Sequence, residues 1–339
     1  MRKLIIPIIL LLGLVFIFVN LAEVQEIVET LQRSEFRFIL IAIGVQLLWT
    51  LNVAASYRTM YRMVGIDEKL SRLFLLVLAA NFFNVIAPSA GVGGIAVFIS
   101  EARRRNYSSA RVTVSGMLVV LFDYLAFLCV LCLGLIVLIR RNNLNTPEIT
   151  ASIILLLVAI VLSTLVYLGM YSETALAKAL AWMARLVNHL LWVFIHRQYL
   201  SETRAYTFAH EVSGALNQLR HNPKSLLKPF LLGLSSKALL ILILFLVFVA
   251  FQVPFSIGTL IGGFSIGYLF LIVSPTPAGI GIVEGALTIG LTSLNVSLGK
   301  ATVITLAYRG ITFWLPLLFG FYALRWLSQG ENISALSDE

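Results

Sequence analysis

The sequence has 339 residues, of which 59% are hydrophobic and 12% are charged, and its mean hydropathy is +0.95. A soluble domain is about 45–50% apolar and about 25% charged, so this chain carries too little charge to cover a water-exposed surface. The composition excludes an ordinary soluble domain and predicts an all-α polytopic membrane protein. The formal net charge of +9 is typical of cytoplasmic loops beside anionic lipid, and no nucleic-acid partner is expected.

Six apolar stretches approach the length of about 20 residues that crosses a bilayer as a helix. The first stretch, 4–20, follows basic residues as a signal peptide does. However, Glu23 and Glu26 stand where a small-residue cleavage site would be, so we expect a retained span. In chain order the predicted full spans are 4–20, 38–55, 112–139, 149–171, 230–251 and 301–324.

Two further apolar regions are interrupted by proline and glycine. Residues 73–100 are broken by the run 88–94, and residues 256–298 are broken by the run 275–281. Proline removes a backbone hydrogen-bond donor, and clustered glycine unwinds a helix. Each region is therefore predicted to be a broken, re-entrant type of helical hairpin with an irregular tip.

Lysine and arginine in short loops predict the orientation of the chain in the membrane. The loops 56–72, 101–111 and 172–228 carry the excess of basic residues. If each hairpin returns to the face it entered from, these loops fall on one side. Arg140 and Arg141 are then a mild exception on the outside. We expect a multi-pass protein of the cell membrane with both termini in the cytoplasm.

This orientation makes the two hairpin regions enter the membrane from opposite sides. The chain 1–339 is thus predicted to be a single transmembrane domain containing an inverted repeat, as in many transporters. Repeat one covers about 38–139 and repeat two about 230–324. The connector 172–228 is expected either to lie on anionic lipid as an interfacial helix or to pack on the helical bundle.

Ionisable residues at membrane depth are functional candidates, and four stand out. Asp123 and Arg309 follow their respective tips at similar separations, so they would occupy similar places in the two repeats. Glu284 and Arg309 could form a structural ion pair. Alternatively, Arg309 or Lys237 could bind phosphate, for which the planar donor fork of arginine is well suited.

The tips contain polar and small residues that are further candidates for substrate binding. Asn81 and Asn84 share one helix face, so they could line a polar cavity or hydrogen-bond the unwound backbone. The tip glycines could present free N–H groups to an anion or only permit close helix packing. These glycines are Gly91, Gly93, Gly279 and Gly281.

No sequence motif indicates hydrolysis, group transfer, a metal site or a cofactor. The four histidines all lie in the connector 172–228, away from the candidate residues. Cys129 and Cys132 lie inside an apolar run and are interpreted as small helix residues. No catalytic residue, cofactor or metal is therefore expected.

A family resemblance emerges in the second half of the chain. Pro-Thr-Pro-Ala-Gly-Ile-Gly-Ile-Val-Glu-Gly-Ala at 275–286, Arg309 and Leu-Pro-Leu-Leu-Phe-Gly at 315–320 resemble the lysylphosphatidylglycerol synthase transmembrane family. This family is also called flippase-like or UPF0104. It shows P-x-P-G-G-x-G-x-x-E followed by an arginine in the middle of a span.

The first half of the chain resembles the same family more loosely, and departs from it in two places. The matching features are Asn84, Pro88, the basic run 103–105 and Asp123. The family often has an acidic residue and an arginine after its first tip, where this chain has Gly-Ile-Ala-Val. The family's usual Glu-Arg pair shortly before Asp123 is replaced here by apolar residues.

The resemblance implies lipid translocation. In the best-known members this region is joined to a soluble aminoacyl-transfer domain and moves the modified lipid outward. The longest soluble stretch here, 172–228, is too short for such a domain, so this chain is expected to be the translocation half alone. It would move a polar-headed, phosphate-containing lipid. Its expected partners are anionic phospholipids and a separate lipid-modifying synthase.

Two other functions are compatible with the sequence. One is a membrane glycosyl- or phospho-group transferase acting on a lipid-linked substrate, with Asp123 and Glu284 as acid or base. The other is a non-transporting subunit of a lipid-modifying complex. The enzyme requires two carboxylates that open to a substrate cavity, the transporter requires a cavity that can open to both sides, and the subunit requires neither.

Overall fold

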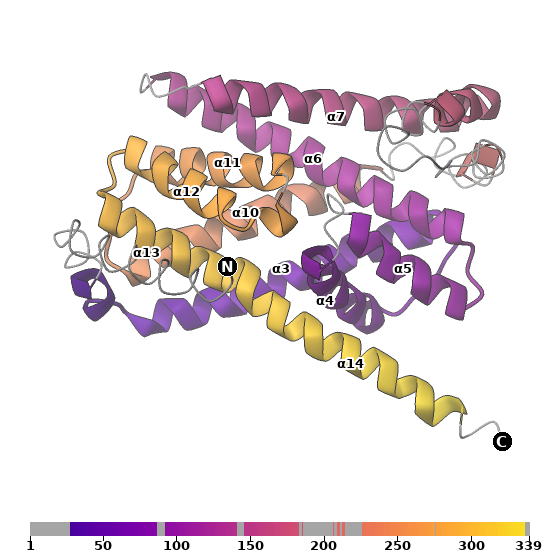
Figure 1. Cartoon of the computed structure of the whole chain (residues 1–339), viewed down its shortest axis with the longest axis horizontal. Helices are drawn as coiled ribbons and strands as arrows, with labels where there is room; N and C mark the ends of the chain where they lie inside the picture. Colours follow the sequence, from indigo (N-terminus) through magenta and orange to yellow (C-terminus); the bar gives the residue numbers. More distant parts are fainter. Residues whose placement is uncertain are drawn as a thin grey trace, which may run out of the picture.

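A computed structural model describes residues 28–86, 92–140, 146–182, 185, 206, 209–210, 212–213, 226–274 and 276–335. Within these ranges every regular element is a helix (Figure 1), which confirms the all-α prediction. The predicted first span, 4–20, lies outside the described residues, as does most of the connector 172–228.

The predicted full spans that fall within the described residues are all helical. α7 (Thr146–Tyr171) runs along one side of the bundle in Figure 1 and corresponds to the predicted span 149–171. Among the described residues, four helical segments are long and apolar enough to cross a membrane: α3 (Phe36–Met63), α6 (Ser109–Arg140), α10 (Leu227–Ala250) and the run Leu298–Trp326.

The last of these segments is not one regular α-helix. It consists of α13 (Leu298–Arg309), a π-helical turn η3 (Gly310–Trp314) and α14 (Leu315–Ala335). Pro316 has no N–H for the carbonyl group one turn earlier and its ring crowds that carbonyl, so the preceding turn widens. A π-turn changes the register of the side chains around it, and this one begins directly after Arg309.

Each predicted hairpin is present as two short helices that pack on each other. The first consists of α4 (Leu70–Ile86) and α5 (Val92–Arg104). The second consists of α11 (Ile257–Val273) and α12 (Ile282–Ser293), joined through the 3₁₀ turn η2 (Pro277–Gly279). α4 and α11 have 17 residues each and are therefore about 26 Å long. That length falls short of the roughly 30 Å thickness of a hydrocarbon core.

The two halves of the chain pack on each other in a reciprocal way. α3 packs along α10, α6 packs on α11, and α14 packs on α4. The α3–α10 contact also contains polar bonds. The Trp49 indole N–H donates to Ser236 Oγ at 2.8 Å, and Asn52 Nδ2 donates to the Leu232 carbonyl at 2.9 Å. Thus the helices of the first predicted repeat contact those of the second at these three places.

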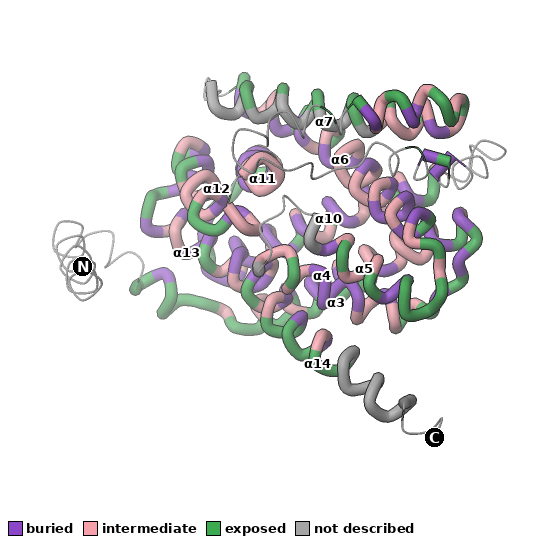
Figure 2. The backbone as a smooth tube through the Cα atoms, turned by 45° about the vertical axis from the view of Figure 1, so that its right-hand side comes forward, coloured by how far each residue is buried: buried purple, intermediate pink, exposed green. Residues whose placement is uncertain are grey.

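Two large buried apolar clusters form most of the interior of the described residues, beside a small third one of Leu138, Ile266 and Leu294. One joins α4, α5 and the adjoining parts of α3 and α6, and the other joins α10 to α13 with the remaining part of α6. In Figure 2 buried residues are concentrated toward the middle of the bundle, while exposed residues recur along α7 and the part of α14 that is coloured. Many of the exposed residues are large and apolar, such as Leu40, Leu157 and Leu318. Lipid is the solvent that such a surface requires.

The beginning of the connector packs on the bundle. Leu176 and Ala177 are buried and belong to the same cluster as α4 and α5. For these residues the second of the two predicted arrangements, packing on the helical bundle, is the one observed.

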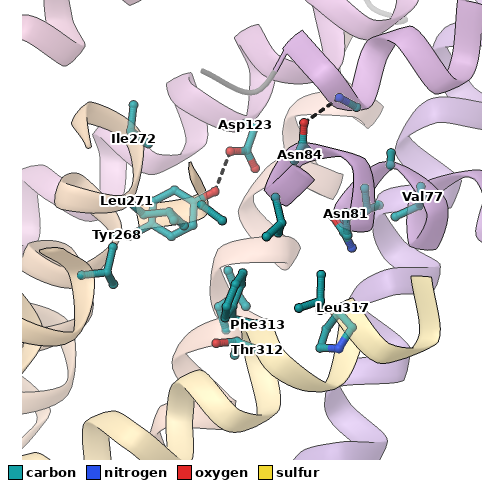
Figure 3. Close-up of a pocket in the computed structure, with 18 of the residues that line it drawn as sticks. Val77, Asn81, Asn84, Asp123, Tyr268, Leu271, Ile272, Thr312, Phe313 and Leu317 are labelled. Carbon is teal, nitrogen blue, oxygen red and sulfur yellow. Dashed lines mark hydrogen bonds between the residues drawn. The ribbon is translucent and has the colours of Figure 1, made fainter. Parts of the chain in front are cut away.

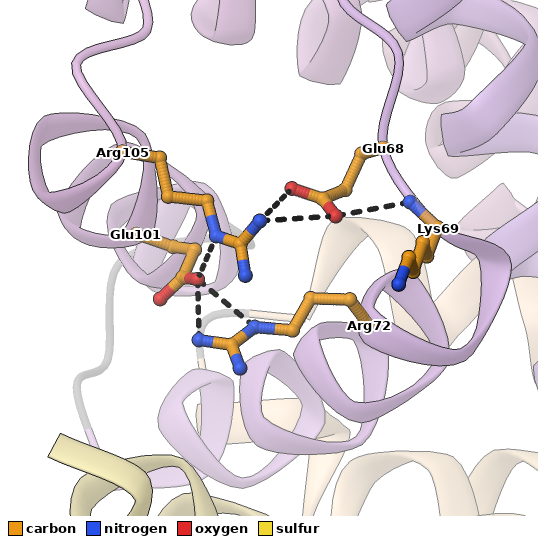
Figure 4. A network of polar contacts seen from close by, with 5 residues as sticks. All are labelled: Glu68, Lys69, Arg72, Glu101 and Arg105. Atoms are coloured by element: carbon orange, nitrogen blue, oxygen red, sulfur yellow. Dashed lines mark hydrogen bonds and ion pairs between the residues drawn. The ribbon is translucent and has the colours of Figure 1, made fainter. Parts of the chain in front are cut away.

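A four-residue ion cluster joins the two ends of the first hairpin that are remote from its tip (Figure 4). Glu101 Oε1 accepts from Arg72 Nη2 at 2.6 Å and from Arg105 Nε at 3.0 Å, and Arg105 Nη1 lies 3.1 Å from Glu68 Oε2. Burial lowers the pKa of the Arg105 guanidinium, but the Glu68 and Glu101 carboxylates outweigh burial and raise it. Arg72 and Arg105 belong to the basic loops that predict the orientation of the chain, and their ion pairs also hold α4 against α5.

The contact between α14 and α4 depends on a glycine, and this gives a first testable prediction. A Cβ at Gly320 would overlap the Leu78 carbonyl oxygen and lie 2.8 Å from Phe82 Cβ, whereas a Cβ at Gly44 would meet nothing within 4 Å. Backbone atoms cannot move aside as a flexible side chain can. We expect Gly320→Ala to destabilise the protein by about 1–3 kcal/mol and Gly44→Ala to be neutral or stabilising. Unfolding in detergent measures both; equal stability of the two variants would contradict the close approach.

Candidate functional site

A cavity of about 660 Å³ lies between the two buried clusters. Both hairpins and the span that contains Arg309 contribute to its wall (Figure 3). Most of the wall is apolar, with polar groups from both halves of the chain. These polar lining residues include Asn81, Asn84, Asp123, Ser274, Thr276, Arg309 and Thr312.

The tip of the second hairpin is a tight turn that only small residues allow. Ala278, Gly279 and Gly281 have positive φ angles of 49°, 74° and 83°. A Cβ at Gly279 would also overlap the side chain of Val283, so glycine is required there for two reasons. The turn presents the Ala278 carbonyl to Arg309 on α13 and the Gly281 N–H to Glu284 on α12.

Glu284 and Arg309 form the ion pair that the sequence suggests. Arg309 Nε donates to Glu284 Oε1 at 2.7 Å, and Arg309 Nη2 donates to the Ala278 carbonyl at 3.0 Å. Glu284 Oε2 in turn accepts from the Gly281 N–H at 2.7 Å. A carboxylate in the first turn of a helix is also favoured by the helix dipole. The expected contact is thus present, and it holds the tip against α13.

Arg309 has donors left over for a ligand. Its guanidinium lies over the Phe313 ring at 4.4 Å, and the residue lines the cavity. Within the part of the chain that the structure describes, its Nη1 group has no hydrogen bond. Glu284 does not line the cavity, so it bonds Arg309 on the side that faces away from the cavity.

A second charged group joins the two halves of the chain. Lys237 on α10 donates to Asp123 Oδ1 on α6 at 2.5 Å, and the Tyr268 hydroxyl on α11 donates to Asp123 Oδ2 at 2.8 Å. Lys237 Nζ also donates to the Tyr268 hydroxyl. The side chain of Lys237 is 0% exposed and that of Asp123 is 29% exposed. Asp123 and Tyr268 line the cavity and Lys237 does not.

The first tip is described in part. Asn84 Oδ1 accepts from the Gly94 N–H at 2.6 Å and thereby caps the first turn of α5. Asn84 therefore both lines the cavity and bonds the backbone, which combines the two predicted alternatives. Asn81 lines the cavity and has no hydrogen-bond partner among the described residues. Gly93 lies in the first turn of α5, and Gly91 lies outside the described residues.

Described residues at or beside both breaks line one cavity. Asn84 from the first hairpin and Ala278 from the second line the same space, and η2 contacts α4. In Figure 3, Asn81 and Asn84 lie across the cavity from Tyr268, with Asp123 and Phe313 between these two sides.

Sequence reasoning missed Tyr268 and Phe313. Tyr268 bonds both members of the Asp123–Lys237 pair, and Phe313 supports the Arg309 guanidinium. The sequence contains only a weak indication of either residue's role. Tyr268 is a polar-tipped residue in an apolar helix, and Phe313 is one of many phenylalanines.

Metal ligation finds no support in the described part of the chain. No group of three or more His, Cys, Asp or Glu side chains comes together there. Cys129 and Cys132 are both exposed and unbridged on α6, where lipid would surround them.

The fold and the site together define a class of protein. It is a multi-pass helical membrane protein with two short-helix hairpins that both line one cavity containing charged side chains.

Comparison with known proteins gives the family. The family model described as the lysylphosphatidylglycerol synthase TM region matches residues 4–320, and the chain belongs to that family. It is 22% identical over 315 residues to a UPF0104 membrane protein of Methanothermobacter thermautotrophicus, with 91% of this chain and 90% of the relative covered. It is 27% identical to one of Pyrococcus horikoshii over 91% of this chain and 92% of the relative, and 20% identical to one of Methanocaldococcus jannaschii over 94% and 93%.

Proposed function

We propose that this protein is a lipid flippase-like transporter that moves a polar-headed, phosphate-containing lipid across the membrane. The observation that carries the proposal is a single cavity that both hairpin tips line and that holds a cationic side chain with unused donors. Arginine binds phosphate through two parallel N–H···O bonds. The membership in a family named for a lipid synthase's transmembrane region supports the same conclusion.

The inverted repeat is part of this proposal. Repeat one comprises α3 to α6 and repeat two comprises α10 to α14, within a single domain. The reciprocal contacts support it, because α6 packs on the hairpin of repeat two and α14 packs on the hairpin of repeat one. In such an arrangement, rocking of one repeat against the other would open the cavity to alternate sides.

We assign the head group to the polar part of the cavity and the acyl chains to its apolar surroundings. The phosphate would accept from Arg309, and Asn81 would bond the remaining polar head. Asn84 lines the wall, and Gly279 and Gly281 shape the turn that brings Ala278 to it. Glu284 and the Asp123–Lys237 pair hold the surrounding helices together.

The alternative functions receive less support. A transferase using Asp123 and Glu284 as acid and base needs both carboxylates at the cavity, and only Asp123 lines it. An unpaired hydrogen-bond donor at membrane depth costs free energy. A non-transporting subunit gives no reason for such a donor to face a cavity between two hairpins.

Reconstitution tests the proposed function directly. The purified protein would be placed in phosphatidylethanolamine–phosphatidylglycerol vesicles containing a phosphatidylglycerol analogue with a fluorescent head-proximal label. A membrane-impermeant reductant then bleaches only the label in the outer leaflet. We expect the bleachable fraction to rise well above that of protein-free vesicles. Bleaching restricted to the outer leaflet, with folded protein and with both anionic and zwitterionic labelled lipids, would contradict the proposal.

The proposed location is the cell membrane, with both termini and the basic loops in the cytoplasm. Loops 56–72, 101–111 and 172–228 carry the Lys and Arg excess that supports this orientation. Reporter fusions active on only one side of the membrane, placed in each loop, should all report the cytoplasm. One loop reporting the outside would overturn the assignment of the adjacent hairpin.

A further inference from the structure

Asp123, Lys237 and Tyr268 form a polar group that is separate from the proposed phosphate contact of Arg309. Asp123 belongs to α6 in the first repeat, whereas Lys237 and Tyr268 belong to α10 and α11 in the second. The bonds among them therefore cross the boundary between the two halves that would have to move during transport.

The group is electrically balanced only while Asp123 is ionised. Lys237 has a fully buried side chain, and its hydrogen-bond partners among the described residues are the Asp123 carboxylate and the Tyr268 hydroxyl. Removing the anionic partner of a buried cation is strongly destabilising, because the remaining charge is left uncompensated away from water. A proton added to Asp123 would leave Lys237 as a buried cation without an anionic partner. The helices that carry the two residues would then have to separate or rearrange.

A proton can reach Asp123 from the cavity. The carboxylate is the partly exposed member of the pair, and it lines the same space as Arg309. Around it the α5 wall is apolar, formed by residues such as Ile95 and Phe98. The other titratable or charged groups that face Asp123 or share its cavity are Tyr57 on α3, Tyr124 on α6, Lys237, Tyr268, Tyr308 and Arg309.

Among these groups Asp123 is the natural proton carrier. Tyrosine hydroxyls stay protonated and arginine stays charged at neutral pH, so neither changes its charge between the two sides of a membrane. Lys237 is 0% exposed and does not line the cavity, so it does not exchange a proton with it. A carboxylate that is partly exposed to a cavity can exchange a proton with whichever side the cavity faces. The Tyr268 hydroxyl is neutral, so it can give up the hydrogen bond that it donates to Asp123 without any change in charge.

We infer that lipid movement by this protein is coupled to protons, with Asp123 as the proton-binding site and Lys237 as its internal counter-ion. The inference rests on the proposed transport function. Protonation of Asp123 in one orientation breaks the α6–α10–α11 contact and allows the cavity to change sides. Loss of the proton on the other side restores the contact, and the ionised protein returns to the first orientation. One proton crosses in each cycle, and no covalent step is involved.

The test uses the same vesicles with an imposed pH gradient and with the membrane voltage clamped at zero by potassium and valinomycin. The leaflet distribution of the labelled phosphatidylglycerol is read by bleaching, and an enclosed pH dye reports proton movement. For one proton per lipid, we expect a gradient of one pH unit to shift the leaflet ratio by up to about tenfold. Without a gradient the ratio should be even.

The variant Asp123→Asn/Lys237→Met removes both charges with little change in volume. Its leaflet ratio should not respond to the gradient. Thr305→Val is a matched control, because Thr305 is buried on α13 and its hydroxyl has no partner among the described residues; it should respond as the wild type does. If the double variant does not fold, Tyr268→Phe provides the second variant, with a reduced response expected.

The outcomes separate the two proposals. If the wild type moves lipid and the leaflet ratio ignores the gradient, proton coupling is wrong and the transport function stands. If the wild type moves no lipid with or without a gradient, the transport function fails and the coupling fails with it. A double variant that responds as fully as the wild type would exclude Asp123 as the proton site.

Discussion

Replacing Arg309 by glutamine is expected to reduce lipid translocation by about tenfold to a hundredfold while the protein remains folded. Hydrogen bonds to charged groups contribute about 1.5–3 kcal/mol, and each 1.4 kcal/mol is about a factor of ten. Glutamine cannot supply the planar fork that the unused donors of Arg309 present to the cavity. The measurement is the initial bleaching rate of labelled phosphatidylglycerol in reconstituted vesicles.

The neighbouring substitutions distinguish ligand binding from support of the fold. Arg309→Lys keeps the charge but loses the simultaneous contacts to Glu284 and the Ala278 carbonyl, so we expect an intermediate rate. Glu284→Gln keeps a side chain that can still accept from the Gly281 N–H and should reduce the rate less than Arg309→Gln does. A folded Arg309→Gln variant with the wild-type rate would rule out the binding role. Loss of folding in both single variants, restored in the double variant, would show a structural pair instead.

The second large effect that we expect is a loss of folding stability when the Asp123–Lys237 pair is broken. Asp123→Asn leaves Lys237, whose side chain is 0% exposed, without an anion. We expect this variant to lose about 3–5 kcal/mol of folding free energy, the usual cost of orphaning a buried charge. Lys237→Met should cost less, because Asp123 is partly exposed to the cavity and keeps its bond from Tyr268. Reversible unfolding in mixed detergent micelles would measure both.

The double variant Asp123→Asn/Lys237→Met supplies the decisive comparison. Since it contains no unpaired charge, it should be more stable than Asp123→Asn alone, which gives a large favourable coupling energy in the double-mutant cycle. Thr305→Val should be neutral or slightly stabilising in the same assay, because it removes a buried hydroxyl that has no partner among the described residues. Simple additivity of the two single substitutions would show that the ion pair contributes nothing.

Local signals in the sequence determined the membrane-spanning helices and the position of the breaks. Apolar length alone predicted α3, α6, α7 and α10, since a helix satisfies its own backbone in lipid. Proline and glycine predicted both hairpins, because their effect on the backbone acts within a few residues. The Glu284–Arg309 contact could also be foreseen, as two opposite charges at membrane depth in neighbouring segments have few other partners.

Only the tertiary structure decided which of the other charges meet. Lys237 and Asp123 lie 114 positions apart, and Tyr268 completes their group from a third helix. No local pattern encodes such a contact, because it depends on how α6, α10 and α11 pack. The same holds for the clamp of Arg72 and Arg105 on Glu101, which the sequence shows only as loop charge. The widened turn after Arg309 also required the packed structure, since Pro316 alone is compatible with a kink as well as a π-turn. Sequence therefore determined where the chain crosses or re-enters lipid, and packing determined which polar groups share the cavity.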